Sequence, residues 1–213
     1  DVYKRQIYED EDVLALNKPA AMPVHESRNH RGDTLSNAVA NYMKGKRDSA
    51  FRAVFRLDRD TSGIVLTAKN ELAAAKLAGK IKKDYYAVVC GETAGKGTID
   101  APIRRLGDSI IKRGVFEDGD SAITHYESIK TNGKYTLLKI NLETGRTHQI
   151  RVHFSNIGHP LAGDDLYGGS RADIARQALH CKAICFTHPV KGKKITLECD
   201  FPPDMEKLIE EMK

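Results

Sequence analysis

Most of the strands predicted from this sequence follow one another without a helix between them, and this order limits the fold more than any other feature. The segment DYYAVVCGE, residues 84–92, has the β-branched and aromatic density of a strand, and residues 136–143 read as another. Between them, residues 98–128 read as short strands and turns, with Asp118-Gly119 as a turn signal. This order predicts an α+β domain with a central mixed, largely antiparallel sheet flanked by helices.

Helices are predicted where apolar residues recur at helical spacing between start and stop signals. They cover residues 34–43, capped by Asp33 or Thr34; a segment from Asn70 as N-cap into Lys82 or Lys83; and a C-terminal apolar stripe in residues 205–212.

One further helix is predicted close to a possible site. Thr147 can cap it, and its apolar stripe is formed by Ile150, Phe154 and Ile157. Arg146 therefore falls in the turn just before a helix N-terminus, a position suited to anions.

The composition is that of an ordinary globular protein. The chain has 213 residues, of which 40% are hydrophobic and 30% charged. It contains no run of about 18 apolar residues that could cross a membrane, and its first residues show no secretory signal pattern. Because internal repeats and Pro/Ser-rich linkers are also lacking, we expect one domain over residues 1–213. Without a membrane span or a secretory signal, we expect this domain in the cytoplasm and without membrane contact.

Cysteine and histidine spacing gives no metal site. Cys181 and Cys185 are four positions apart, but His180 and His188 do not complete a recognised zinc spacing around them. Small buried hydrophobic side chains explain the cysteines best, and such free thiols fit a reducing compartment. We therefore expect no bound metal.

The charge balance is mildly basic. A net charge of +5 is compatible with nucleic acid binding but does not establish it. Short basic clusters lie at residues 80–83, 104–105, 112–113 and 191–194, and each cluster by itself reads as a solvated face.

The stretch VFRLDRDTSGIVLTAK, residues 54–69, combines a strand-like apolar run with charges in its middle. Buried carboxylates are costly unless they are paired and hydrogen-bonded. Asp58 can therefore be a structural ion pair at a sheet edge, or a carboxylate that an arginine keeps ionised as a nucleophile or base. The residues at 61–63, Thr-Ser-Gly, would form a tight turn from which Asp58 projects at a strand end.

A magnesium-dependent phosphatase of the haloacid-dehalogenase type is a competing interpretation. Residues 58–62 come near its D-x-D-x-T pattern, and Asp164 with Asp165 could supply further metal ligands. However, the threonine is one position early, and Arg56 and Arg59 would oppose a cation.

NKPAAMPVH at 17–25, RLDRDTSG at 56–63, KDYYA at 83–87 and TGRTHQIRVH at 144–153 form an ordered set of motifs. This set resembles the motifs of the RluA-like pseudouridine synthases, which isomerise uridine in ribosomal or transfer RNA. RLDRDTSG at 56–63 is similar to the family's R-L-D-x-x-T-S-G, and TGRTHQIRVH at 144–153 repeats another family segment. NKPAAMPVH at 17–25 and KDYYA at 83–87 also match, and shorter matches extend the resemblance from about residue 7 to residue 203. Phe55 stands where the family commonly has histidine, and Ala21 where it favours glycine.

The resemblance implies the pseudouridine synthase fold and a role for each candidate residue. Asp58 would be the catalytic aspartate, and Arg146 the partner that keeps it ionised. A uridine in folded RNA must leave its stack, and Arg56 would fill or hold the space that the base vacates. Tyr85 would offer the flipped base a flat face and a hydroxyl, and Ile150 an apolar floor.

The reaction implied needs no redox step or energy input, so we expect no cofactor. The expected partner is structured ribosomal or transfer RNA, bound through phosphate contacts. We expect the protein to be a monomer and not to act on DNA. Many family members carry a separate N-terminal RNA-binding domain, and none is found in this chain. The alternative is a non-catalytic RNA-binding module on the same scaffold.

Overall fold

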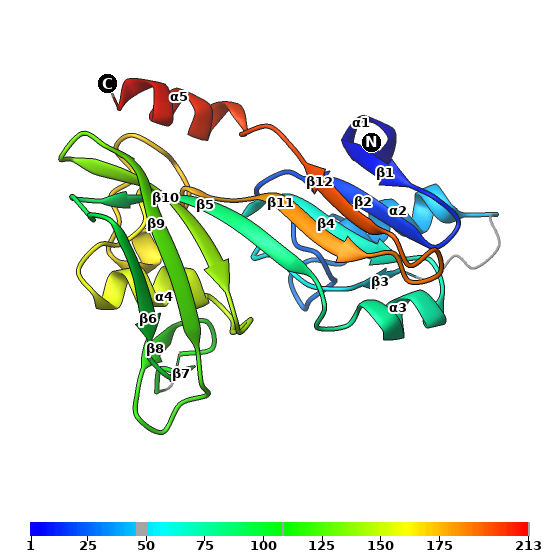
Figure 1. Ribbon diagram of the computed structural model, residues 1–213, viewed down its shortest axis with the longest axis horizontal. Helices are drawn as coiled ribbons and strands as arrows, with labels where there is room; N and C mark the ends of the chain where they lie inside the picture. The colour runs from blue at the N-terminus through cyan, green and yellow to red at the C-terminus, as the bar shows by residue number, and fades with distance from the viewer. Residues whose placement is uncertain (46–50, 108, 213) are drawn as a thin grey trace. The chain divides into compact units, whose positions relative to one another are not determined.

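The computed structural model describes residues 1–45, 51–107 and 109–212, and the chain divides into two compact units. Unit 1 consists of Asp1–Lys83 and Cys181–Asp200, and unit 2 of Asp84–His180 and Phe201–Lys213. The strands β5 and β11 contribute residues to both units, and Figure 1 colours the chain from its N-terminus to its C-terminus.

Unit 1 is built on a sheet in the order β1-β2-β4-β11, with β3 added to β4 and β12 to β11. All seven residues of β4 are buried, as expected for a strand covered on both faces. The pairs β1–β2, β2–β4, β3–β4 and β11–β12 are antiparallel. The strands are β1 (Gln6–Glu9), β2 (Val13–Lys18), β3 (Arg52–Ala53), β4 (Ser62–Ala68), β11 (Leu179–Thr187) and β12 (Lys194–Glu198).

The predicted starts of the unit 1 helices are confirmed, but one predicted end is wrong. Thr34 closes a capping box on α2, and the Asn70 side chain accepts the Ala73 N–H at 2.8 Å at the start of α3. However, α3 ends at Leu77, because the chain turns through Gly79 at φ +70° and Lys82 already belongs to β5. The helices are α1 (Val2–Arg5), α2 (Leu35–Met43) and α3 (Glu71–Leu77).

Unit 2 is built on the antiparallel strands β5-β10-β9-β6, with a separate two-stranded sheet of β7 and β8. The predicted stretch 98–128 is indeed short strands and turns, although residue 108 lies outside the described residues. The strands are β5 (Lys82–Cys90), β6 (Lys96–Asp100), β7 (Ile103–Arg105), β8 (Arg113–Val115), β9 (Ile123–Thr131) and β10 (Tyr135–Leu142).

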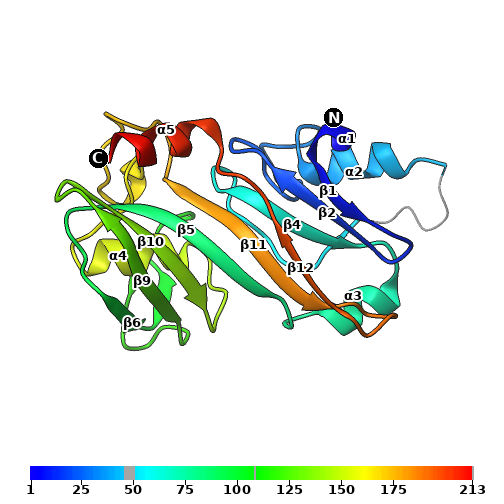
Figure 2. The ribbon, with the colours of Figure 1, turned by 45° about the horizontal axis from the view of Figure 1, so that its top comes forward.

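Helices α4 (Gln149–Asn156) and α5 (Pro203–Glu211) pack within unit 2. Phe154 of α4 meets Tyr126 of β9 edge to face, and Met205 and Leu208 of α5 join a buried cluster, which confirms the C-terminal stripe. Figure 2 shows α4 beside the strands of this unit. The α+β prediction is confirmed, and none of the helices in the described residues is long and apolar enough to cross a membrane.

Candidate active site

Asp58 and Arg56 lie together in an irregular loop of unit 1, residues 54–61, between the short strand β3 and β4. The tight turn expected at residues 61–63 lies earlier in the chain, because Ser62 and Gly63 already belong to β4. The Thr61 N–H donates to the Asp58 carbonyl at 3.1 Å, which makes a turn that no strand could contain. Asp58 is half-buried and Arg56 is exposed, so the loop presents both groups outside the core.

A buried lysine that the sequence analysis did not single out holds this loop in place. Lys18, at the end of β2, is 0% exposed, and its ammonium donates to the carbonyls of Pro19, Met22 and Arg59 at 2.9, 2.8 and 2.9 Å. The Arg59 carbonyl also accepts the Met22 N–H at 3.2 Å. Three carbonyls satisfy the three donors of a lysine ammonium, so Lys18 joins the 19–22 turn to the loop that carries Asp58.

Gly63 fixes the other end of the loop. Its φ is +115°, and a Cβ at this position would lie 2.3 Å from the carbonyl oxygen of Cys181 on β11. The backbones of β4 and β11 therefore approach each other where only glycine fits. This is a physical reason for glycine at the end of the RLDRDTSG motif.

The turn tied by Lys18 contains a strained residue. Ala21 has φ 59°, in the left-handed region that disfavours residues with a Cβ. It is the position at which the resembling family favours glycine, so the turn keeps a glycine conformation with alanine in it.

Ala21→Gly is expected to raise the free energy of unfolding by about 0.5–1 kcal/mol, because relief of strain exceeds the added entropy of the unfolded chain. Urea unfolding would measure this change. The control is Ala20→Gly, whose φ is not positive and which should lower stability. Equal losses in the two variants would contradict the strain at Ala21.

The two arginines of the loop have different neighbours, Asp60 for Arg59 and His25 for Arg56. Arg59 pairs with the adjacent Asp60, with Nη2 to Oδ2 at 2.8 Å. Burial and the charge of Arg56 lower the pKa of His25, which places the end of the NKPAAMPVH segment beside Arg56. Two of the motifs in the family resemblance therefore meet within unit 1.

Phe55, which stands where the resembling family commonly has histidine, offers its ring to the ammonium of Lys83. The Lys83 ammonium lies 4.8 Å from the centroid of the Phe55 ring, and burial lowers the pKa of Lys83. The departure from the family pattern thus leaves the loop packed against the start of β5.

Unit 2 carries the other predicted site residues. Tyr85 of β5 is 6% exposed and pairs with Ile140 of β10, and Ile150 in the first turn of α4 is 4% exposed. Both side chains are buried, as residues that line an apolar site or a core must be. Because Asp58 belongs to unit 1, the pairing of Arg146 with Asp58 stays a prediction.

Arg146 is exposed in the loop before α4, and its Nε donates to the Ser121 carbonyl at 3.0 Å. The predicted Thr147 cap is wrong, because His148 occupies the N-cap position at φ 58° without a side-chain cap. The side chain of Gln149 holds the loop instead, since its Oε1 accepts the Arg146 N–H at 3.0 Å. A glutamine at the first helical position reaching backwards is not among the common capping patterns.

An arginine of the TGRTHQIRVH segment joins α4 to Asp164 and Tyr167. Both carboxylate oxygens of the buried Asp164 accept from Arg151, at 2.7 and 2.8 Å, and the Arg151 guanidinium lies over the ring of Tyr167. The Tyr167 hydroxyl bonds to Nδ1 of His148 at 2.8 Å. With Asp164 occupied by an arginine, the metal-binding role that the phosphatase interpretation requires of it is contradicted.

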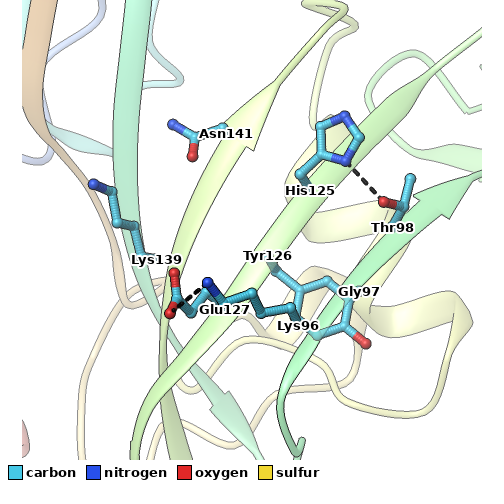
Figure 3. Close-up of a pocket in the computed structure, with 8 residues that line it drawn as sticks. All are labelled: Lys96, Gly97, Thr98, His125, Tyr126, Glu127, Lys139 and Asn141. Atoms are coloured by element: carbon cyan, nitrogen blue, oxygen red, sulfur yellow. Dashed lines mark hydrogen bonds and ion pairs between the residues drawn. The ribbon is translucent and has the colours of Figure 1, made fainter.

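A groove of about 470 Å³ crosses β6, β9 and β10 of unit 2 (Figure 3). Its lysines have acidic partners, since Lys96 pairs with Glu127 at 3.1 Å and Lys139 with Asp84 at 2.8 Å. Side chains alternate along β10, so Lys139 of the groove and its buried neighbour Ile140 point to opposite faces of the sheet. Ile140 pairs with Tyr85, so Tyr85 is on the face opposite to the groove. The groove is therefore neither an anion site nor part of the predicted site.

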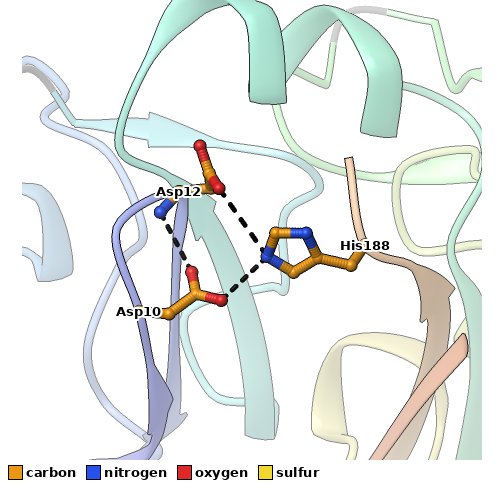
Figure 4. A group of neighbouring side chains, drawn as sticks. All are labelled: Asp10, Asp12 and His188. Atoms are coloured by element: carbon orange, nitrogen blue, oxygen red, sulfur yellow. Dashed lines mark hydrogen bonds and ion pairs between the residues drawn. The ribbon is translucent and has the colours of Figure 1, made fainter. Parts of the chain in front are cut away.

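Asp10, Asp12 and His188 form a cluster with the composition of a metal site (Figure 4). Nδ1 of His188 accepts the N–H groups of Val190 and Lys191, so the ring proton is on Nε2, which donates to Asp10 at 2.8 Å. Burial opposes ionisation of Asp10, but hydrogen bonds, led by that from Lys191, hold its pKa well below the ordinary value. The histidine has no lone pair left for a metal, so the cluster is a structural network.

Comparisons with known proteins agree with the motifs. A family model described as RNA pseudouridylate synthase matches residues 12–156. The uncharacterized RNA pseudouridine synthase YjbO of Bacillus subtilis is 46% identical over 211 residues, which are 95% of this chain and 74% of that protein. Ribosomal large subunit pseudouridine synthase D of Pseudomonas aeruginosa is 37% identical over an alignment that covers 96% of this chain and 70% of that protein. Human RNA Pseudouridylate Synthase Domain Containing 4 shares the fold with a TM-score of 0.79 at 19% identity, over 99% of this chain and 94% of that one.

Proposed function

Because this chain belongs to the RNA pseudouridylate synthase family, and so is an enzyme that isomerises uridine in RNA, we propose that Asp58 carries the reaction and that no cofactor takes part. The RluA-like resemblance is confirmed by relatives of 37–46% identity. The observation that supports Asp58 most is its place in a loop held at one end by the buried Lys18 and at the other by Gly63. A carboxylate on so rigid a mount is suited to a fixed reaction geometry.

The chemistry requires one bond to break and one to form. The bond from N1 of uracil to the ribose breaks, the freed base turns, and carbon 5 joins the same sugar carbon. The proton on carbon 5 then leaves, and N1 gains a proton, so the product is an isomer and no electrons enter or leave. Asp58 takes part by attacking the sugar or the base, or by removing a sugar proton.

The other site residues act on the base and on Asp58. Tyr85 stacks on the flipped uracil and places its hydroxyl near carbon 5, while Ile150 supplies the apolar floor. Arg146 keeps Asp58 ionised through a charge-assisted pair. Arg56 holds the space that the base leaves in the RNA, which agrees with its exposure on the Asp58 loop.

The RNA substrate is ribosomal or transfer RNA, acted on by a monomeric, cytoplasmic enzyme whose residues 1–213 work as one catalytic domain. Large-subunit ribosomal RNA is the first to test, because several relatives of 37% identity are named for that subunit. Sequence-selective RNA enzymes read unpaired loops and shape, so the target uridine should lie outside regular duplex.

The experiment is release of tritium from large-subunit ribosomal RNA transcribed with uridine labelled at carbon 5. We expect the protein to release tritium in buffer containing EDTA, and pseudouridine mapping of the product to locate the site. The alternative, an RNA-binding module without catalysis, requires RNA binding without tritium release from any RNA. No release from ribosomal or transfer RNA would overturn the proposed function.

A further inference from the structure

Lysines gather at the end of unit 1 that lies away from Asp58. The strand β4 runs from the loop of Asp58 to Lys69, a length of about 20 Å for its seven residues. Beyond this end, α3 lies beside the turn between β11 and β12, as Figures 1 and 2 show, and the Lys76 ammonium donates to the Pro189 carbonyl at 2.9 Å. We use the name lysine face for the exposed lysines of these neighbouring segments: Lys76 of α3, Lys80 just after α3, Lys193 of the turn and Lys194 at the start of β12.

The β11–β12 turn is held rigidly. The buried His188 ring accepts two backbone N–H groups of the turn, its own backbone N–H donates to the Lys193 carbonyl at 2.7 Å, and its carbonyl accepts the Gly192 N–H at 3.0 Å. Asp10 fixes His188 in turn at 2.8 Å. The Asp10–His188 network therefore fixes the backbone of the turn, so less backbone entropy is lost when the turn binds a partner.

The charge of the lysine face is not neutralised. Asp10 pairs with Lys191 at 2.8 Å, so that lysine is not part of the lysine face. Lys76, Lys80, Lys193 and Lys194 form no ion pair with a carboxylate in the part of the chain that the structure describes. Ammonium groups without carboxylate partners attract a polyanion, and lysine meets phosphate as a point charge.

We propose that the lysine face binds the phosphate backbone of the substrate RNA at a distance from the target uridine. The inference rests on the proposed function, since a uridine isomerase acts on RNA that extends well beyond one nucleotide. Phosphate binding about 20 Å from Asp58 positions the folded RNA without reading its sequence. It acts on the strength of RNA binding and leaves the chemistry to the Asp58 loop.

The test compares two triple variants with the same change in net charge. Lys80, Lys193 and Lys194, all changed to Gln, remove the lysine face but spare Lys76 and its bond to Pro189. The matched control changes Lys4, Lys130 and Lys207 to Gln, exposed lysines on other elements. Affinity for a large-subunit ribosomal RNA transcript is measured against salt concentration by fluorescence anisotropy, alongside KM and kcat for tritium release.

In the lysine-face variant, the slope of log affinity against log salt should become shallower by about 2.4, because each of the three phosphates that a lysine neutralises adds about 0.7–0.9 to that slope. The ratio of wild-type to variant affinity should then grow about 30-fold when the salt concentration falls fourfold. The effect should fall on KM rather than kcat, and the control triple should follow the wild type.

Equal losses of RNA affinity in the two triple variants would mean that only net charge matters. Unchanged RNA affinity in the lysine-face variant would mean that this surface serves a partner other than RNA, such as an anionic membrane. Either result overturns the proposal. If the wild type releases no tritium while its RNA affinity still depends on the lysine face, the proposed function fails and the RNA-binding surface stands.

Discussion

Asp58→Asn is expected to lower tritium release from carbon-5-labelled RNA by at least about 1000-fold under single-turnover conditions. Asparagine keeps the shape of the side chain but can neither carry a negative charge nor accept a proton at neutral pH. Because Asp58 lies on a loop and is half-buried, the substitution should leave folding intact. RNA affinity should not fall, since the substitution removes a negative charge from a protein whose proposed substrate is a polyanion.

The control for this substitution is Asp60→Asn, two positions along the same loop. Asp60 pairs with the exposed Arg59, and such surface pairs contribute little. We expect the Asp60 variant to stay within about tenfold of the wild type in tritium release. Normal activity in Asp58→Asn, or a comparable loss in both variants, would remove Asp58 from the reaction.

Lys18→Met is expected to lower both stability and turnover. Methionine retains the length of the side chain but leaves the carbonyls of Pro19 and Met22 without the lysine donor, while Arg59 keeps its bond from the Met22 N–H. An unsatisfied buried acceptor costs about 1–3 kcal/mol, and removal of a buried charge offsets part of that. We expect the free energy of unfolding to fall by about 2–4 kcal/mol.

Lys18 should affect turnover through the Asp58 loop. Its ammonium donates to the carbonyl of Arg59 at 2.9 Å, and Arg59 is the residue that follows Asp58. Displacement of a catalytic group by about 1 Å can cost about 100-fold, so kcat should fall by about 10–100-fold at temperatures where the variant is folded. The loss should appear in kcat rather than in RNA affinity.

Lys69→Met separates this effect from general destabilisation. Lys69 is partly buried and binds Glu9 and the Asp10 carbonyl, but it lies at the end of β4 opposite to the Asp58 loop. This variant should lose stability without a matching fall in kcat. If both lysine variants lose kcat in proportion to their stability, Lys18 does not position the loop.

Local signals in the sequence predicted what local interactions decide. The caps at Asn70 and at Asp33 or Thr34 are predictable because an N-cap bond joins residues only three apart, and Thr34 is the cap that forms. The α5 stripe is predictable because its spacing is helical. The ends of elements were less predictable. The end of α3 was set too late because pairing of Lys82 in β5, not helix propensity, decides where the strand begins.

The same division holds within the site. The motif around Asp58 could be identified from residue types and spacing, but its conformation could not. The loop is irregular because Lys18, distant in sequence, draws the Arg59 carbonyl towards the 19–22 turn. The predicted Thr147 cap failed for a similar reason, since Gln149 reaches back to Arg146 while also bonding to β9 through the Ile123 carbonyl.

By itself, the sequence determined the family, the α+β class and the candidate reactive group, because these depend on residue identity and on short-range periodicity. Only the tertiary structure decided that Ala21 adopts a glycine conformation, that Asp164 belongs to Arg151, and that lysines from α3 and the β11–β12 turn share one surface. Each of these depends on groups far apart in the chain, and no local pattern records which distant carbonyl or carboxylate a side chain will meet.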